Sequence, residues 1–293
     1  MRLTTKIITG IILSIFLLSL LHIIGYSFTD RKNYTAFFPN LKIILPQTDK
    51  TGINIESYRV ITLDSERSDT TNRYGYYYIN KESVFFINPA TNPSEENILF
   101  IPEVLNEFIT TQISNDTLTI KIKLDEVREK YCDMEEVIED NRFFLQTHLI
   151  WISGFNFYLH TTNVNVINRL YGVQTKISNI ATDSIQIYTS GEITIDSCKA
   201  NFMEPNSNRG ITVANSVVKA INIDLDRVNN WTIEPNCDVD VYYFTGKSNH
   251  NISLHNDYHG KIVWQPKNKN AEFNVKIKGN AAQLNFETQS LSE

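Results

Sequence analysis

The stretch DSIQIYTSGEITIDS, residues 183–197, decides the fold. On each side of its Thr-Ser-Gly turn, apolar residues alternate with polar ones. Alternation at every second residue is the period of a β-strand with one buried face. Such pairs and triplets recur about every 8 to 13 residues as far as Phe286. They are Ile185/Ile187, Ile193/Ile195, Ile211/Val213, Ile221/Ile223/Leu225, Trp231/Ile233, Val239/Val241, Ile252/Leu254, Ile262/Trp264, Phe273/Val275/Ile277 and Leu284/Phe286.

These strands predict an all-β chain in which residues 143–287 form a parallel β-solenoid. Two apolar runs would form one coil of roughly 20 to 22 residues. Successive coils would stack about 4.8 Å apart, with alternate side chains filling the interior. An antiparallel sandwich also has short, evenly spaced strands. However, the Asn-Gly turns that favour its hairpins are mostly absent from this part of the sequence.

The apolar run Ile7 to Ile24 is long enough, as a helix of about 27 Å, to cross a bilayer. Residues 1–28 are therefore predicted to be a transmembrane anchor, followed by a spacer at 29–36. Arg2 and Lys6 precede the run, which predicts that the chain crosses a bacterial inner membrane once, with its C-terminal part in the periplasm. The alternative is a signal peptide that is cleaved near Ser27, releasing a secreted protein.

Three further segments lie outside the repeats. Residues 37–124 read as an N-terminal β region that ends in a hairpin turning at Asn115-Asp116. Residues 125–142 are charged, with apolar residues at three- and four-residue steps, and they predict an amphipathic helical insert. The polar residues 288–293 read as a tail.

Composition narrows the function. The net charge of −6 argues against a nucleic-acid surface, which would normally be basic. The three cysteines, Cys132, Cys198 and Cys237, form no CxxC pair, so a zinc ribbon or redox dithiol is not expected. Cys198 and Cys237 follow apolar pairs, and both a disulfide between them and two buried, reduced thiols stay open.

The sharpest candidate site is acidic. Alternation places Asp224, Asp226, Asp238 and Asp240 on the outer wall, with Ile223 and Val241 inside. Paired carboxylates would suit a polysaccharide hydrolase or lyase, or a calcium ion. The plainer interpretation is a solvated wall that keeps the parallel sheet soluble. Because stacked like charges repel, Asn, Lys or Thr is expected between these carboxylates.

A second candidate cluster is His250, His255, Asp257 and His259, around one strand and its following turn. Such residues can bind zinc, but they are also ordinary surface residues. The sequence has no Gly-rich phosphate loop, GxSxG or HExxH motif, so no cofactor is expected.

Three runs carry a resemblance: NDTLTIKIKL at 115–124, DSIQIYTSGEITIDS at 183–197 and NSVVKAINIDLDRV at 215–228. Together with the membrane-spanning start, they resemble the auto-transporter adhesin, head GIN domain family of bacterial envelope proteins. The resemblance covers about residues 108–286 and implies a right-handed solenoid outside the inner membrane, without enzyme activity. The β region before residue 108 and the charged insert after Leu124 depart from the family pattern.

The sequence therefore predicts a membrane-anchored, non-enzymatic solenoid whose wall binds an envelope protein or a glycan. The alternative is a polysaccharide hydrolase or lyase that uses the outer aspartates.

Overall fold

The computed structural model describes residue 19 and residues 41–46, 48–66, 76–79, 82–131, 149–228, 230–255, 260–278 and 286–288. Most of these residues form β-strands in four open sheets, which confirms the all-β prediction. Apart from Ser19, the predicted anchor Ile7 to Ile24 lies outside the described residues. Within the described ranges, no helix is long and apolar enough to span a membrane.

The largest sheet has ten strands in the order β23-β21-β19-β17-β15-β13-β11-β3-β8-β7. Neighbours from β23 to β8 are parallel, and β7 is antiparallel to β8. The strands are β3 (Val60–Glu66), β7 (Ile109–Ser114), β8 (Thr117–Lys123), β11 (Val164–Asn168), β13 (Ala181–Thr189), β15 (Lys199–Ser207), β17 (Val217–Asp224), β19 (Asp238–Gly246), β21 (Lys261–Pro266) and β23 (Phe286–Thr288).

The second sheet has eight strands in the order β18-β16-β14-β12-β5-β10-β6-β2. Pairing is parallel from β18 to β10 and antiparallel from β10 through β6 to β2. The strands are β2 (Lys50–Asn54), β5 (Val84–Asn88), β6 (Ile98–Pro102), β10 (Asn156–His160), β12 (Gln174–Ser178), β14 (Glu192–Asp196), β16 (Gly210–Ala214) and β18 (Trp231–Ile233).

Two small sheets and three short helices complete the described structure. One sheet joins β1, β9 and β4, and the other joins β20 and β22; all of their pairs are parallel. The remaining elements are β1 (Leu41–Ile44), β4 (Tyr76–Ile79), β9 (Leu149–Ser153), β20 (His250–His255), β22 (Phe273–Lys278), the 3-10 helices η2 (Pro93–Glu95) and η3 (Glu103–Phe108), and the helix α2 (Leu124–Tyr131).

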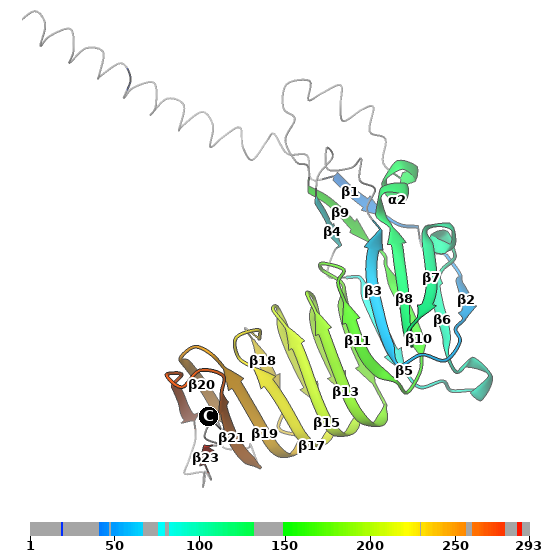
Figure 1. Cartoon of the computed structure of the whole chain (residues 1–293). Helices are drawn as coiled ribbons and strands as arrows, with labels where there is room; N and C mark the ends of the chain where they lie inside the picture. The colour runs from blue at the N-terminus through cyan, green and yellow to red at the C-terminus, as the bar shows by residue number, and fades with distance from the viewer. Residues whose placement is uncertain are drawn as a thin grey trace, which may run out of the picture.

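From β10 to β19 the chain passes alternately through the two large sheets. From β13 on, each return to a sheet brings a parallel strand beside the previous strand of that sheet. Ile193 pairs with Ile211, 18 residues later, and Ile211 pairs with Trp231, 20 residues later. Figure 1 shows β11, β13, β15, β17, β19 and β21 side by side in one row. The expected parallel order of successive strands is confirmed, and the antiparallel sandwich is wrong for these residues.

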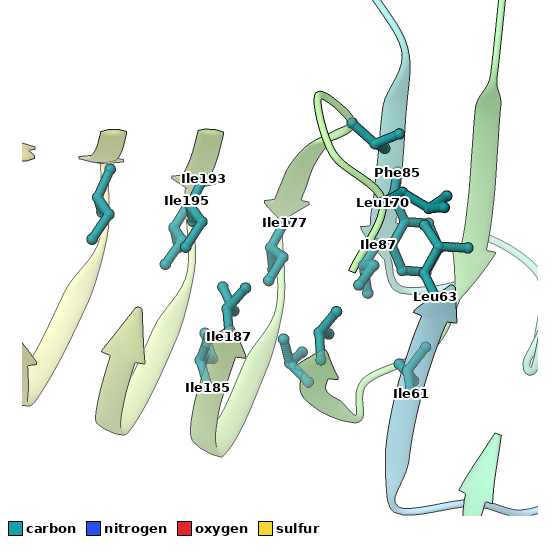
Figure 2. Packing of buried hydrophobic residues seen from close by; sticks show 14 of the residues in the cluster. Ile61, Leu63, Phe85, Ile87, Leu170, Ile177, Ile185, Ile187, Ile193 and Ile195 are labelled. Carbon is teal, nitrogen blue, oxygen red and sulfur yellow. The ribbon is translucent and has the colours of Figure 1, made fainter. Parts of the chain in front are cut away.

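The core lies between the two large sheets (Figure 2). Ile185 and Ile187 on one sheet and Ile193 and Ile195 on the other are at most 1% exposed. Burying an aliphatic side chain of this size contributes about 1.5–3 kcal/mol before the cost in chain entropy. The alternation read from the sequence therefore supplies the central column of the fold.

The predicted alternation is wrong at Val241. In β19, Val239 is buried, Asp240 is exposed, Val241 is half-buried and Tyr242 is buried. The same one-residue shift after the third residue occurs in β15 and β17. The strand pairing also skips Asp240. The inward positions therefore change parity within β15, β17 and β19, and an alternation continued from Val239 wrongly places Val241 inside. Ile223, which follows the shift in β17, is buried as predicted.

Apart from β1 and β4, the strands before β9 belong to the same two large sheets as the repeats. β3 lies between β11 and β8, and β5 lies between β12 and β10. The β7–β8 hairpin is confirmed, with positive φ at Asn115 (51°) and Asp116 (58°), as two-residue hairpin turns require. α2 covers the first part of the predicted helical insert, and residues 132–148 lie outside the described residues.

Candidate binding site at the strand ends

A groove of about 590 Å³ runs along the ends of the strands of the ten-stranded sheet. Its lining comes from the ends of β11, β13 and β15 and from the turn that follows β17. We call it the strand-end groove. The lining residues used below are Arg169, Tyr188, Ser190, Asn206, Asn208 and Arg227.

Asn206 is the unusual residue of the strand-end groove. It is only 4% exposed, and neither atom of its side-chain amide has a hydrogen-bond partner among the described residues. An unpaired buried polar group costs about 1–3 kcal/mol, and nearly all such groups in folded proteins are paired. A buried amide with a free donor and a free acceptor, lining a groove, indicates a position for a polar ligand.

Pro205 explains why the sheet is irregular at this point. The pairing of β15 with β17 begins at Lys199–Val217 and stops at Met203–Ile221, although both strands continue. Proline has no N–H to donate to a ladder and is rare in central strands. The pairing with β13, on the other side of β15, continues to Ser207. Only one side of β15 is therefore unpaired beside Asn206.

Asn206 belongs to a row of buried polar residues. Counting on from the Met203–Ile221 pair places Asn206 level with Asp224, and Asp224 pairs with Thr245. All three are less than 10% exposed, and the Thr245 hydroxyl also has no partner among the described residues. We call Asn206, Asp224 and Thr245 the buried polar stripe.

A second pocket of about 380 Å³ continues the strand-end groove, because both include Asp226 and Arg227. In this pocket Asp224 Oδ2 lies 3.3 Å from Arg227 Nε and 2.6 Å from Lys267 Nζ. The Asp224 side chain is only 8% exposed. The prediction that Asp224 lies on the solvated wall is therefore wrong: it faces away from the core, but two cations from later turns cover it.

Asp226 accepts hydrogen bonds from the backbone N–H groups of Lys247 (2.6 Å) and Ser248 (3.4 Å) and lies 3.0 Å from His250 Nε2. Burial raises the pKa of Asp226, but these hydrogen bonds outweigh it, so the pKa lies below its usual value. A general acid for glycoside hydrolysis needs the opposite shift.

The four predicted aspartates do not converge. Asp224 is level with Thr245 near the end of β19, whereas Asp238 begins that strand. Seven residues of strand separate these positions, on the order of 20 Å. Asp238 and Asp240 are both exposed, as predicted. The acidic pairs therefore occupy opposite ends of the wall and do not form one carboxylate site.

The histidine cluster is described only in part. His250 contacts Asp226, and the side chain of His255 as well as Asp257 and His259 lie outside what the structure describes. Within the described ranges, no group of three His, Cys, Asp or Glu residues could hold a metal ion. The zinc site stays a prediction.

The turns at the other end of the ten-stranded sheet, where its strands begin, are built differently. There Asn215 donates to Asp196 Oδ1 at 2.7 Å, and Asn236 donates to Asn215 at 2.6 Å. Two asparagines thus follow the Asp196 carboxylate from turn to turn. We call the turns at residues 179–180, 197–198, 215–216 and 236–237 the closed corner.

The two cysteines of the closed corner are not bonded to each other. Ser216 stands between them: the Cys198 N–H donates to Ser216 Oγ, and the Asp238 N–H donates to the Ser216 carbonyl. Two strand spacings, about 9.6 Å, exceed the Cα separation that a disulfide tolerates. The structure thus decides for reduced thiols, and burial raises the pKa of both.

Sequence reasoning missed Pro205 and Asn206. The available signal was the proline in NFMEPNSNRG, residues 201–210, inside a run of otherwise regular strand pattern. A proline within such a run marks a place where the ladder is interrupted.

No protein-family model matches the chain, and no curated protein matches it. Among solved structures, a "putative adhesin" of Parabacteroides distasonis is 11% identical, over 85% of this chain and 100% of its own, with a TM-score of 0.36. A "putative adhesin" of Parabacteroides merdae is 12% identical, over 85% and 99%, with a TM-score of 0.35. A "putative lipid binding protein" of Parabacteroides distasonis is 12% identical, over 84% and 99%, with a TM-score of 0.36. TM-scores this low do not establish a common fold.

Proposed function

We propose that the chain is a non-enzymatic binding protein of the bacterial envelope. A β-solenoid, of the kind found in the auto-transporter adhesin, head GIN domain family, is held outside the inner membrane by Ile7 to Ile24. Its strand-end groove binds an extended glycan.

The observation that carries this proposal is the unpaired, buried amide of Asn206. A carboxamide presents donors and an acceptor side by side, which matches two neighbouring hydroxyl groups of a sugar. Ser190 and Asn208 add further polar groups to the groove, and Tyr188 adds an aromatic ring. Aromatic rings offer apolar area together with a polar tip, which suits the mixed surface of a sugar.

The stacking of the strands favours an extended ligand. The groove reaches from the end of β11 to the turn after β17, three strand spacings or about 14 Å. Each strand adds its own polar side chains to the groove, so a chain-like ligand lying across the strands meets a new set at each step. A compact ligand would use only one part of this groove.

The alternative hydrolase or lyase has no comparable support. Asp224 and Asp226 lie at and just after the end of β17, whereas Asp238 and Asp240 lie at the start of β19. The pKa of Asp226 is also shifted away from that of an acid catalyst. We therefore propose binding without turnover.

The test is Asn206→Leu, a change of similar size, in the full chain purified in detergent. Removing the unpaired amide is expected to raise the unfolding free energy by about 1–2 kcal/mol. It is also expected to abolish binding to whichever members of an oligosaccharide panel bind the wild type. A residue that only supports packing would behave in the opposite way, losing stability while binding persists.

Asn222→Leu is the matched control. Like Asn206, Asn222 lies on the outer face of its strand, which is β17. Its side-chain carbonyl oxygen has no hydrogen-bond partner among the described residues, and Asn222 does not line the groove. Its replacement should leave glycan binding unchanged. A panel in which no oligosaccharide binds the wild type would contradict the proposed function.

The anchor has its own test. Fractionation of the producing cells should place the intact chain in the inner membrane. A mature protein that starts near Phe28 would instead support cleavage and secretion.

A further inference from the structure

We infer that the glycan is acidic, with carboxylates that meet the arginines at the two ends of the strand-end groove. This inference rests on the proposed function and specifies its ligand. The chain as a whole carries a net charge of −6. The residues that line the groove and its continuation nevertheless include several cations.

The groove and the pocket that continues it are lined by four cations, Arg169, Arg227, Lys247 and Lys267, and by two carboxylates. Each cation follows the end of a different strand, namely β11, β17, β19 and β21. The cations therefore form a row along the strand ends. Such a row attracts a chain with repeated negative charges and gives it a direction.

Both carboxylates of this region are already engaged. Asp224 is held by Arg227 and Lys267, and Asp226 by two backbone N–H groups and His250. Their negative charge is directed into these contacts, beside the groove, and so opposes an incoming anion less than two free carboxylates would. Lys247 has no ion pair among the residues that the structure describes, so its charge remains available.

The arginines keep donors for a ligand. Arg169 Nη1 lies 3.2 Å from Asp64 Oδ2, and Arg227 contacts Asp224 through Nε. Each arginine side chain is 62% exposed. A guanidinium has five N–H donors in a fork that fits a carboxylate, so one contact leaves a face for a second carboxylate.

Between the two arginines the groove is polar but uncharged. Asn206 lies on β15, between the strand of Arg169 and the turn of Arg227, with Ser190 and Asn208 beside it. The order along the groove is therefore cation, neutral hydrogen-bonding groups, cation. An oligosaccharide in which carboxylated sugars alternate with neutral ones has the matching order.

The experiment measures calorimetric binding of the full chain in detergent to two probes. One is a hexasaccharide that alternates glucuronate with N-acetylglucosamine. The other is the same hexasaccharide with its carboxyl groups reduced to alcohols. The acidic probe is expected to bind at least about tenfold more tightly than the reduced probe, and its affinity should fall as salt is added.

Arg169→Gln and Arg227→Gln should each weaken binding of the acidic probe by about tenfold and leave binding of the reduced probe unchanged. The control is Arg59→Gln, since Arg59 is an exposed arginine paired with Asp116 away from the groove. It should change neither affinity.

The outcomes separate the inference from the proposed function. Equal binding of the two probes, lost in Asn206→Leu, would overturn the acidic ligand and keep a glycan groove. If the acidic probe binds more tightly and keeps this affinity in both arginine variants, the assignment of Arg169 and Arg227 as the carboxylate-binding groups would be overturned. Binding of neither probe, with no glycan bound in the panel, would overturn both proposals.

Discussion

The chain crosses between the two large sheets through two sets of turns, which satisfy the same requirement in different ways. At the closed corner the chain leaves the eight-stranded sheet and enters the ten-stranded one, and its turns resemble one another. At the strand-end groove it makes the return passage, and the turns differ in length and charge. Both sets of turns must satisfy backbone groups that the ladders leave free.

The closed corner does so with a repeated device. Asn179, Ser197 and Asn215 have φ of 58°, 54° and 48°, the left-handed region that asparagine tolerates better than most residues. The next residue of each turn points into the core: Ile180, Cys198 and Ser216 are at most 2% exposed. The Asn215 side chain then hydrogen-bonds to Asp196 and Asn236 in the turns on either side.

The strand-end groove leaves polar groups unpaired. The side-chain amide of Asn206 is buried there without a partner among the described residues, and the ladder between β15 and β17 stops beside Pro205. The difference teaches where to look for function in a repetitive fold. Repeated and fully paired turns serve stability, whereas an interruption that costs stability is expected at a binding site.

The largest predicted effect tests how tightly the groove side is built. A Cβ added at Gly191 would lie 1.9 Å from the carbonyl oxygen of Val173, the residue just before β12. Gly191→Ala is expected to lower the unfolding free energy by about 3 kcal/mol or more, because backbone must move. Gly210→Ala is the control, since its nearest atom would be 3.9 Å away. Equal denaturation midpoints for the two variants would contradict the close stacking.

A disulfide tests the register of the closed corner. Ser216 is one strand spacing, about 4.8 Å, from both Cys198 and Cys237, which is within the range for a disulfide. Ser216→Cys should form an intramolecular bond on mild oxidation at alkaline pH, worth about 3 kcal/mol for a loop of this size. Mapping by mass spectrometry, with Cys237→Ser added to identify the partner, checks it. A Cys198–Cys237 bond in the unaltered chain would refute the register.

The next effect separates the two roles of Asn215. Asn215→Ala loses its hydrogen bonds to Asp196 and Asn236 and places alanine at a φ of 48°. The unfolding free energy is therefore expected to fall by about 2 kcal/mol. Asn215→Gly relieves the backbone strain alone and should recover about half of that loss. Equal urea midpoints for both variants would show that φ plays no part.

The smallest effect concerns pH. The pKa of Asp226 lies below its usual value, so its carboxylate adds stability above the unfolded-state pKa and loses this contribution as the pH falls through the folded-state pKa. Asp226→Asn should cost less than about 1 kcal/mol at pH 7, because the site is partly exposed. The difference from wild type should disappear at acid pH. Asp240→Asn, at an exposed position near the start of β19, is the control and should leave the unfolding free energy at pH 7 unchanged.

The sequence predicted the spacing of the strands and most of the core. Ile185, Ile187, Ile193 and Ile195 are buried as their alternation requires, because side-chain period 2 is a property of any strand. It could not predict Tyr242 in place of Val241, because the shift in parity occurs where the pairing of β17 with β19 skips Asp240. That point depends on the register between neighbouring strands.

The candidate site was predictable only in its composition. Asp224 and Asp226 lie beside the groove, and Asp238 and Asp240 were grouped with them only because they share an outward pattern. Alternation gives the face of a residue and says nothing of its position along a neighbouring strand. Register, which places Asp224 beside Thr245, comes from pairing between distant residues.

By itself, the sequence determined that the chain is rich in strands, which apolar residues fill the interior and where turns occur, since these follow from local periodicity and backbone preference. Only the tertiary structure decided that β3 and β5 insert among later strands, that Ser216 separates the two cysteines, and that Asn206 lies buried without a partner. These features depend on contacts between residues far apart in the chain. No local pattern encodes which of many similar strands become neighbours.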